Sequence, residues 1–91
     1  MTNTEWTLIF NTKAEKKLKK LPHDIQKRII DFFEKRVLTA KDPTVHALSL
    51  TGTHQGLWRF RVGDYRVVTR IHNHEMVVVA IDVGHRKEIY T

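Results

Sequence analysis

The sequence predicts a single α+β domain, in which an antiparallel sheet of about four strands carries an N-terminal helical hairpin packed on one face. Three observations predict it. Residues 1–91 suffice for one hydrophobic core, two early segments have apolar residues at helical spacing, and several later segments alternate apolar and polar residues. One strand, two helices and then a run of strands is an order typical of α+β domains.

The first strand is predicted at residues 5–10. This segment is rich in aromatic and β-branched residues, and its large apolar side chains alternate through Trp6, Leu8 and Phe10. The spacing changes at residue 12, where Thr12 with Glu15 three positions later has the pattern of a capping box. A first helix is therefore expected over roughly residues 13–20.

Pro22 ends the first helix, and Asp24 is in position to cap a second helix over roughly residues 23–38. Its apolar positions follow a stripe of helical period, which indicates one buried face. The lysines of the two helices are expected to face water or a polyanion; these are Lys13, Lys16, Lys17, Lys20 and Lys27.

The strands of the second half are marked by turn residues. Residues 39–56 are mostly a connection with a short edge element at 47–50. Residues 57–62 alternate strictly, Gly63-Asp64 is a turn signal, and residues 65–71 form the returning strand. The continuous apolar run 76–83 is expected to be a strand inside the sheet, covered on both faces and ended by Gly84.

Size and composition exclude several classes of protein. A chain of 91 residues has no room for a dinucleotide-binding or barrel enzyme, and without cysteine it has no disulfide scaffold, thiolate zinc site or cysteine nucleophile. No apolar run is long enough to span a membrane and the N-terminus lacks a secretory signal, so the cytoplasm is the expected location. The net charge of +6 is compatible with a nucleic acid, an acidic protein or an ordinary solvated surface.

The candidate site is a cluster of arginines. If Gly63-Asp64 is a two-residue turn, Arg61 lies opposite Arg66, Arg59 lies on the same face, and Arg70 lies further along it. Directly opposed like charges are destabilising, and a polyanion would relieve them. Guanidinium groups on a rigid hairpin suit a phosphodiester and the charge that develops in its transition state. A solvated outer face with the charges splayed apart is the alternative.

Further candidates lie near the C-terminus. Tyr90 has a ring that can stack on a base and a hydroxyl that can exchange a proton, although a terminal aromatic residue that pins the tail to the core has the same signature. His85, next to Arg86, can act as acid or base near neutral pH. His72 and His74 have a spacing that permits metal ligation, but no carboxylate pair lies near them, so no metal site is predicted.

Several blocks of residues together resemble the RelE branch of the RelE/ParE toxin superfamily. They are Leu50-Thr51-Gly52, the run W-R-x-R-x-G-x-Y-R at residues 58–66, the run V-G-H-R at residues 83–86, and Tyr90. The resemblance covers nearly the whole chain and implies a RelE-like microbial ribonuclease fold. It also implies a toxin of a type II toxin–antitoxin system that enters the ribosomal A site and cleaves the mRNA there without a metal or other cofactor.

The resemblance also implies roles for individual residues. Arg59, Arg61 and Arg66 match the strand residues that bind the scissile phosphate in that family, and Arg61, Arg66 and Arg86 would stabilise charge on the phosphorane formed when a ribose 2′-hydroxyl attacks its own 3′ phosphate. Arg70, further along the same face, is expected from the strand register to bind substrate with Arg59. Tyr90 or His85 would transfer the proton. Positions 59 and 61 are often lysines in relatives, and because arginine stays protonated it is a poor general base.

The partners implied are a cognate antitoxin, the ribosome and mRNA, with operator DNA contacted only through the antitoxin complex. Two alternatives stay open. One is a ParE-like inhibitor of DNA gyrase, which acts through protein contact and needs no nuclease site. The other is a non-catalytic RNA- or DNA-binding module, in which the arginines only position phosphates.

Overall fold

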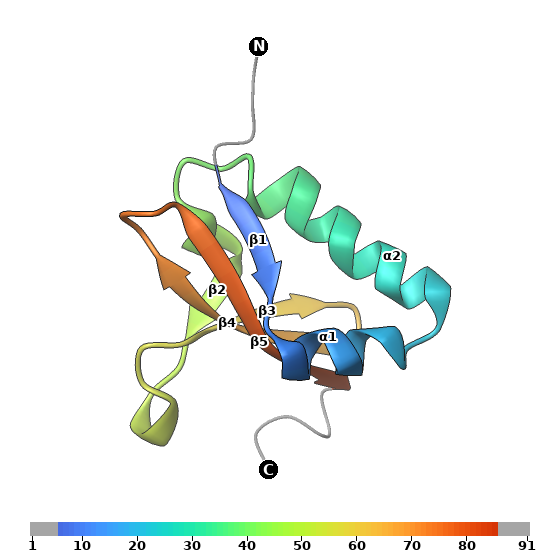
Figure 1. Ribbon diagram of the computed structural model, residues 1–91. Helices are drawn as coiled ribbons and strands as arrows, with labels where there is room; N and C mark the ends of the chain where they lie inside the picture. Colours follow the sequence, from blue (N-terminus) through green and yellow to red (C-terminus); the bar gives the residue numbers. More distant parts are fainter. Residues whose placement is uncertain (1–5, 86–91) are drawn as a thin grey trace.

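A five-stranded sheet with two helices packed on it forms the described part of the chain, residues 6–85 of a computed structural model (Figure 1). The elements are β1 (Thr7–Phe10), α1 (Thr12–Lys19), α2 (His23–Phe32), η1 (Phe33–Val37), η2 (Pro43–His46), β2 (Ala47–Ser49), η3 (Gly52–His54), β3 (Trp58–Val62), β4 (Tyr65–His72) and β5 (Val77–His85). The predicted α+β class with an early helical pair is confirmed. The predicted first strand begins two positions later, at Thr7, after a buried Trp6.

The strand order is β1-β5-β4-β3-β2. The sequence predicted an antiparallel sheet, but one pair of neighbouring strands is parallel. The pairs from β2 to β5 are antiparallel, whereas β1 runs parallel to β5 with Thr7 beside Val77. Strands that pair in parallel need a long crossover, and here the rest of the domain lies between the two partners. The predicted edge element is confirmed as β2, and β5 is confirmed as an interior strand.

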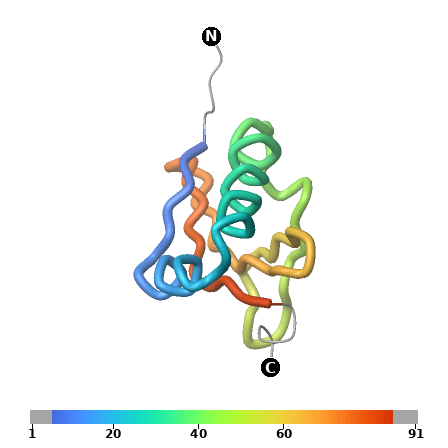
Figure 2. Tube along the Cα trace, turned by 90° about the vertical axis from the view of Figure 1, so that its right-hand side faces the viewer, coloured from blue at the N-terminus to red at the C-terminus, as the bar shows by residue number. Residues whose placement is uncertain are grey.

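Both helices contribute to one core on one face of the sheet. α1 buries Ala14 and Leu18 against β5, and α2 with the following turn buries Ile29 and Phe33 over β3. The ring of Phe33 lies 4.9 Å from that of Phe60 on β3. Figure 2 shows the two helices against the strands, and Figure 1 shows them diverging from their short connection.

The second helix changes its winding before it ends. α2 stops at Phe32 and continues as a π-helical turn through Val37, so the predicted span of 23–38 is covered by two helical types. Phe33 and Val37, at the ends of this wider turn, are both fully buried. Burial of these two apolar side chains therefore accompanies the departure from regular α-helix.

Both predicted helix caps are wrong. The N-cap of α1 is Asn11, whose side-chain oxygen accepts a hydrogen bond of 2.8 Å from the backbone N–H of Ala14, and Thr12 is the first helical residue. Asparagine is at least as good a cap as threonine, so the cap lies one position earlier. α2 begins at His23 after Pro22, which leaves Asp24 inside the first turn, where its charge favours the helix dipole.

The end and the start of β5 also differ from the prediction. Gly84 does not end the strand, because it pairs with Arg66 and the ladder continues to His85. Met76 is not in the strand: it has a φ of 56°, which is left-handed backbone that closes the turn after β4. The predicted turn at Gly63-Asp64 is confirmed, with Val62 paired to Tyr65 and a φ of 60° at Gly63.

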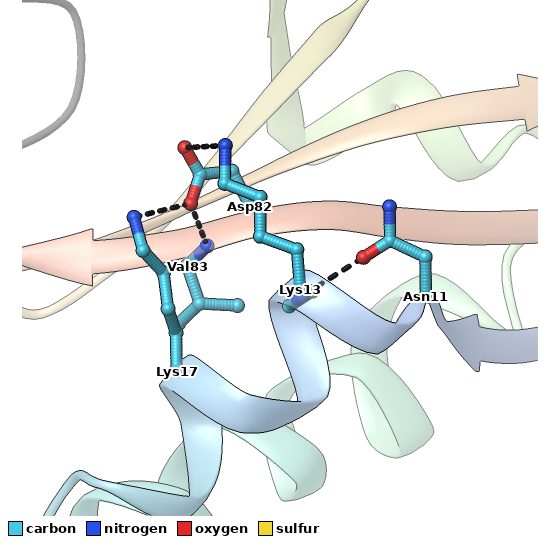
Figure 3. Close-up of polar contacts among 6 residues, drawn as sticks. Asn11, Lys13, Lys17, Asp82 and Val83 are labelled. Carbon is cyan, nitrogen blue, oxygen red and sulfur yellow. Dashed lines mark hydrogen bonds and ion pairs between the residues drawn. The ribbon is translucent and has the colours of Figure 1, made fainter.

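A bulge interrupts β5 where β1 stops. Val68 and Thr69 of β4 face Asp82 and Ala80, so Ile81 is the extra residue, and the pairing of β1 ends at Ala80. Beyond this point α1 takes the place of β1 beside β5. Figure 3 shows the polar contacts that join them: Lys17 Nζ donates to Asp82 Oδ1 at 2.8 Å, and Lys13 Nζ lies 3.6 Å from Asp82 Oδ2.

The segment that leads into β2 is held by a local turn. The carboxylate of Asp42 accepts hydrogen bonds from the hydroxyl and the backbone N–H of Thr44, at 2.6 and 3.0 Å. These bonds stabilise the charged form and hold the pKa of Asp42 below its ordinary value. Asp42 is the N-cap of the short helix η2, and the edge strand β2 follows η2 directly.

We expect Asn11→Ala to lower the free energy of unfolding by about 1 kcal/mol, because the backbone N–H of Ala14 loses its acceptor. Asn11→Ser should retain most of the stability. The matched control is Thr12→Ala, which should change the stability by less than about 0.5 kcal/mol because Thr12 is not the cap. Urea unfolding measures both, and a larger loss for Thr12→Ala would show that the cap is misplaced.

We expect Asp82→Asn to lower the free energy of unfolding by about 1 kcal/mol at low salt and by less at high salt, since two partly screened ion pairs are lost. The control is Glu15→Gln, which removes only the exposed pair with Lys19 and should cost less than about 0.5 kcal/mol. Urea unfolding at two salt concentrations tests this, and equal losses for both variants would contradict the proposed anchoring of α1.

Candidate functional site

The arginines predicted from the sequence do share one face of the sheet. Arg61 lies directly opposite Arg66, and Arg59 is two positions earlier on β3, opposite Val68. Their neighbours along β3 and β4 point the other way, because Phe60, Val62 and Val67 are buried in the core. The surface that carries the arginines is therefore the one opposite the helices, and we call it the arginine face.

Burial differs among these arginines. Arg61 and Arg70 are exposed, whereas Arg59 and Arg66 are half-buried. A half-buried guanidinium on a strand keeps its planar group in a restricted orientation, which suits bidentate contact with a phosphate. Directly opposed positions of a hairpin have their Cβ atoms about 5 Å apart. Arg61 and Arg66 thus concentrate two positive charges on a rigid support.

Two residues beside the arginines shape this face. Arg61 of β3 pairs with Arg66 of β4, and Arg66 pairs in turn with Gly84 of β5. At this row of paired residues across the sheet, β5 therefore carries no side chain. In the next row Leu48 of β2 lies opposite Arg59, with 52% of its surface exposed. The arginine pair is therefore flanked by backbone on one side, and an apolar side chain stands beside Arg59. Sequence reasoning missed both features because they depend on which strands are neighbours.

His85 does not join the arginines. It pairs with Tyr65, and the two rings make an edge-to-face contact with centroids 5.5 Å apart. Tyr65 pairs with Val62, which is buried, so His85 is on the helix side of the sheet. His85 was expected to act with Arg61 and Arg66 because it stands next to Arg86 after the strand and its imidazole can exchange a proton near neutral pH. The bulge at Ile81 changes the alternation, and the continuing ladder then turns His85 to the other face.

The remaining candidates are separated from this cluster or lie outside the described residues. His72 is at the far end of β4 and His74 is in the turn after it, and over residues 6–85 no group of His, Asp and Glu is arranged to hold a metal ion. Arg86 and Tyr90 belong to residues 86–91, outside the described part. Among the helices of residues 6–85 none is both long and apolar enough to cross a membrane.

A pocket between α1 and β5 is a further feature that the sequence did not predict. It has a volume of about 270 Å³ and is lined by Lys17, Lys20, Leu21, Val83 and Gly84. The lysines of α1 were expected to face water or a polyanion. The side chains of Lys13 and Lys17 are 63% and 41% exposed, and both also pair with Asp82, 65 positions after Lys17 in the chain. No local pattern signals an ion pair over that distance.

The comparisons with known proteins agree with this architecture. A family model described as the ParE toxin of type II toxin–antitoxin systems (parDE) matches residues 8–90. No curated protein matches the chain. The structure is similar to that of the RelBE2 toxin–antitoxin complex from Mycobacterium tuberculosis, at 28% identity and a TM-score of 0.81 over 93% of this chain and 95% of that one.

One archaeal and one bacterial toxin structure are also similar to this chain over most of its length. The RelE–RelB complex from Pyrococcus horikoshii OT3 is similar at 25% identity and a TM-score of 0.71, over 90% of this chain and 96% of that one. The isolated RelE toxin from E. coli, at 23% identity and a TM-score of 0.60 over 88% of this chain and 83% of that one, shares the fold. The chain therefore belongs to the ParE toxin family, within the RelE/ParE superfamily, and is a toxin of a type II toxin–antitoxin system.

Proposed function

We propose that this toxin is a ribosome-dependent endoribonuclease that cleaves mRNA in the A site, in the cytoplasm and without a metal. The observation that carries the proposal is the pair of guanidinium groups at directly opposed positions, Arg61 and Arg66, on the arginine face. A phosphodiester that lies between two guanidinium groups can bind both, and the pair stabilises the negative charge that develops in its transition state. The similar RelE structures support the same assignment.

The chemistry that fits this face is an internal transesterification. The ribose 2′-oxygen attacks the adjacent 3′ phosphorus, the bond from phosphorus to the 5′-oxygen of the next nucleotide breaks, and the departing oxygen takes up a proton. The products are a 2′,3′-cyclic phosphate and a free 5′-hydroxyl. Arg61 and Arg66 would bind the non-bridging oxygens, where negative charge increases in the phosphorane, and Arg86 is proposed to add a third guanidinium.

Proton transfer needs a group other than these arginines, because guanidinium stays protonated. His85 lies on the helix side of the sheet, which disfavours it as the acid or base for a phosphate held by Arg61 and Arg66. Tyr90 is therefore the proposed proton-transfer residue. Arg59 and Arg70, along the same face, are proposed to bind the phosphates on either side of the cleaved bond.

The form of the site supports the proposed dependence on the ribosome. The arginine face is a sheet surface, and the Arg61–Arg66 row carries no further side chain at Gly84 on the adjoining strand. Within residues 6–85, this surface offers charge but few groups that would hold a flexible single strand in the geometry for in-line attack. A message already held by the ribosome would supply that geometry.

The second candidate function is inhibition of DNA gyrase through protein contact, which the ParE description of the family model favours. In that case the arginine face would bind an acidic protein surface, and no RNA bond would be cleaved. The two functions are separated by assaying gyrase supercoiling and mRNA cleavage with the same preparation.

We expect Arg61→Ala to reduce cleavage of mRNA on translating ribosomes by at least 100-fold, because the phosphorane loses one of its paired guanidinium groups. Primer extension locates and quantifies the cuts. Arg36→Ala is the matched control: Arg36 is an exposed arginine of η1, outside the sheet, and its removal should change cleavage by less than about 3-fold.

Absence of cleavage by the wild-type protein, with gyrase inhibition in the parallel assay, would overturn the nuclease proposal in favour of the second candidate. Cleavage that survives Arg61→Ala at full rate would show that the arginine face is not the catalytic surface. Arg61→Lys should retain part of the activity, since it keeps the charge and loses the bidentate geometry.

We expect Tyr90→Phe to lower the cleavage rate by about 100-fold or more, and His85→Gln to lower it by less than about 5-fold, since general acid–base groups contribute roughly 10²–10⁴-fold. The rate is measured from pH 6 to 9 under single-turnover conditions. The reverse order of effects would place the proton transfer on His85 and would require the end of β5 to rearrange on the ribosome.

A further inference from the structure

One exposed apolar side chain lies directly beside an arginine of the arginine face. Among residues 6–85, the large apolar side chains that remain exposed are Ile9, Val45 and Leu48. Ile9 is on β1 at the opposite edge of the sheet, and Val45 is on η2, outside the sheet. Leu48 is on β2, pairs with Arg59, and has 52% of its surface exposed. Single exposed leucines are common on protein surfaces, so the neighbours of Leu48 decide whether it has a role.

The spacing of sheet positions relates Leu48 to the proposed catalytic pair. Directly opposed residues of an antiparallel pair have Cβ atoms about 5 Å apart, which sets the separation of Leu48 from Arg59. Arg61 is two positions further along β3, a step of about 7 Å on the same face. Starting from the catalytic pair, this face therefore offers a second site for an anion at Arg59 and then an apolar contact at Leu48.

The position of β2 keeps Leu48 accessible from the side. β2 is the terminal strand of the sheet, and within residues 6–85 its single neighbouring strand is β3 (Figure 1). Proteins commonly place charged residues or proline on such an edge, which prevents unwanted association. A leucine gives no such protection, but it leaves an apolar surface that a ligand on the arginine face can contact.

This sequence of charged and apolar groups matches the structure of a nucleotide. A phosphodiester binds guanidinium groups, whereas the flat faces of a nucleobase pack on aromatic or apolar side chains. The bases of single-stranded RNA can be splayed away from one another, so a base can reach a side chain next to its own phosphate. An RNA strand whose phosphates lie on Arg61 and Arg59 would therefore bring a base close to Leu48.

We propose that Leu48 is a substrate-binding residue that packs against the nucleobase between the scissile phosphate at Arg61 and the neighbouring phosphate at Arg59. This rests on the proposed nuclease function and adds an apolar contact to the same face. Leucine forms no side-chain hydrogen bonds, so the contact accepts any base. Because the contact is made before and during the reaction, it strengthens binding of the message and does not accelerate the chemical step. Covering the exposed half of a leucine side chain raises affinity by about 3- to 10-fold.

Single-turnover cleavage tests the proposal, on ribosomes that hold a defined mRNA and an empty A site, with the rate measured over a range of toxin concentrations. Leu48→Ser removes the apolar contact. The matched control is Val45→Ser, since Val45 is 64% exposed and lies on η2, outside the sheet. Far-UV circular dichroism and urea unfolding confirm that the variants are folded.

We expect Leu48→Ser to raise the half-saturating toxin concentration by about 3-fold or more and to change the maximal rate by less than about 2-fold. Val45→Ser should change both quantities by less than about 2-fold. Leu48→Phe should bind at least as tightly as the wild type, because an aromatic ring stacks well on a base. A fall in the maximal rate alone for Leu48→Ser would contradict the proposal, since Leu48 would then act on the geometry of the arginines.

Abasic ribonucleotides identify the contacted base. They are placed in turn at the two positions that flank the cleaved bond, and each mRNA is assayed with the wild type and with Leu48→Ser. At one position the abasic mRNA should weaken binding of the wild type as much as Leu48→Ser does, and the combination should cause no further loss. At the other position the two losses should multiply. Losses that multiply at both positions would overturn the proposal, because removal of either base would leave the partner of Leu48 in place.

The same assays separate this proposal from the nuclease assignment. Equal half-saturating concentrations for Leu48→Ser and Val45→Ser, with cleavage intact, would overturn the base contact and leave the nuclease assignment in place. Absence of cleavage by the wild type would overturn both. Loss of gyrase inhibition in Leu48→Ser with unchanged RNA cleavage would show that Leu48 contacts a protein, which also overturns the proposal.

Discussion

The rest of the structure depends on the register of the β3–β4 hairpin. The turn at Gly63-Asp64 pairs Val62 with Tyr65, and every later pair along the two strands follows from it. In this register Phe60 and Val67 are both fully buried, and Arg61 and Arg66 are both on the opposite face. Because side chains alternate along a strand, a slip of one residue would exchange these faces. Burial of the aromatic core therefore also places the arginines together.

A second constraint acts at the other side of the sheet. β1 is short, and β5 extends beyond it, so the end of β5 is supported by α1. The contacts of Asp82 with Lys13 and Lys17 hold this junction, and the bulge at Ile81 sets which side chains of β5 face the arginines. The same junction forms the pocket between α1 and β5. One structural feature thus shapes both this pocket and the strand that borders the proposed catalytic face.

The pattern of local residues predicted a large part of the fold. Alternation and turn residues located β3 and β4 with their register, and helical spacing located α1 and α2 to within a few residues. The face shared by Arg59, Arg61 and Arg66 followed from that register alone. The capping residue of α1 was misplaced by one position, because Asn11 and Thr12 are both suitable caps and only the hydrogen bond to Ala14 distinguishes them.

The sequence by itself determined the α+β class, the hairpin and the arginine face, because each depends on residues close together in the chain. Only the tertiary structure decided the parallel pairing of β1 with β5, the position of His85 on the helix side, and the joining of α1 to Asp82. These features bring together segments about 65 or more positions apart or depend on a bulge. Contacts between distant segments and a bulge leave no periodic pattern in the sequence. Long-range packing and strand pairing select each of these features from several arrangements that the local sequence would also accept.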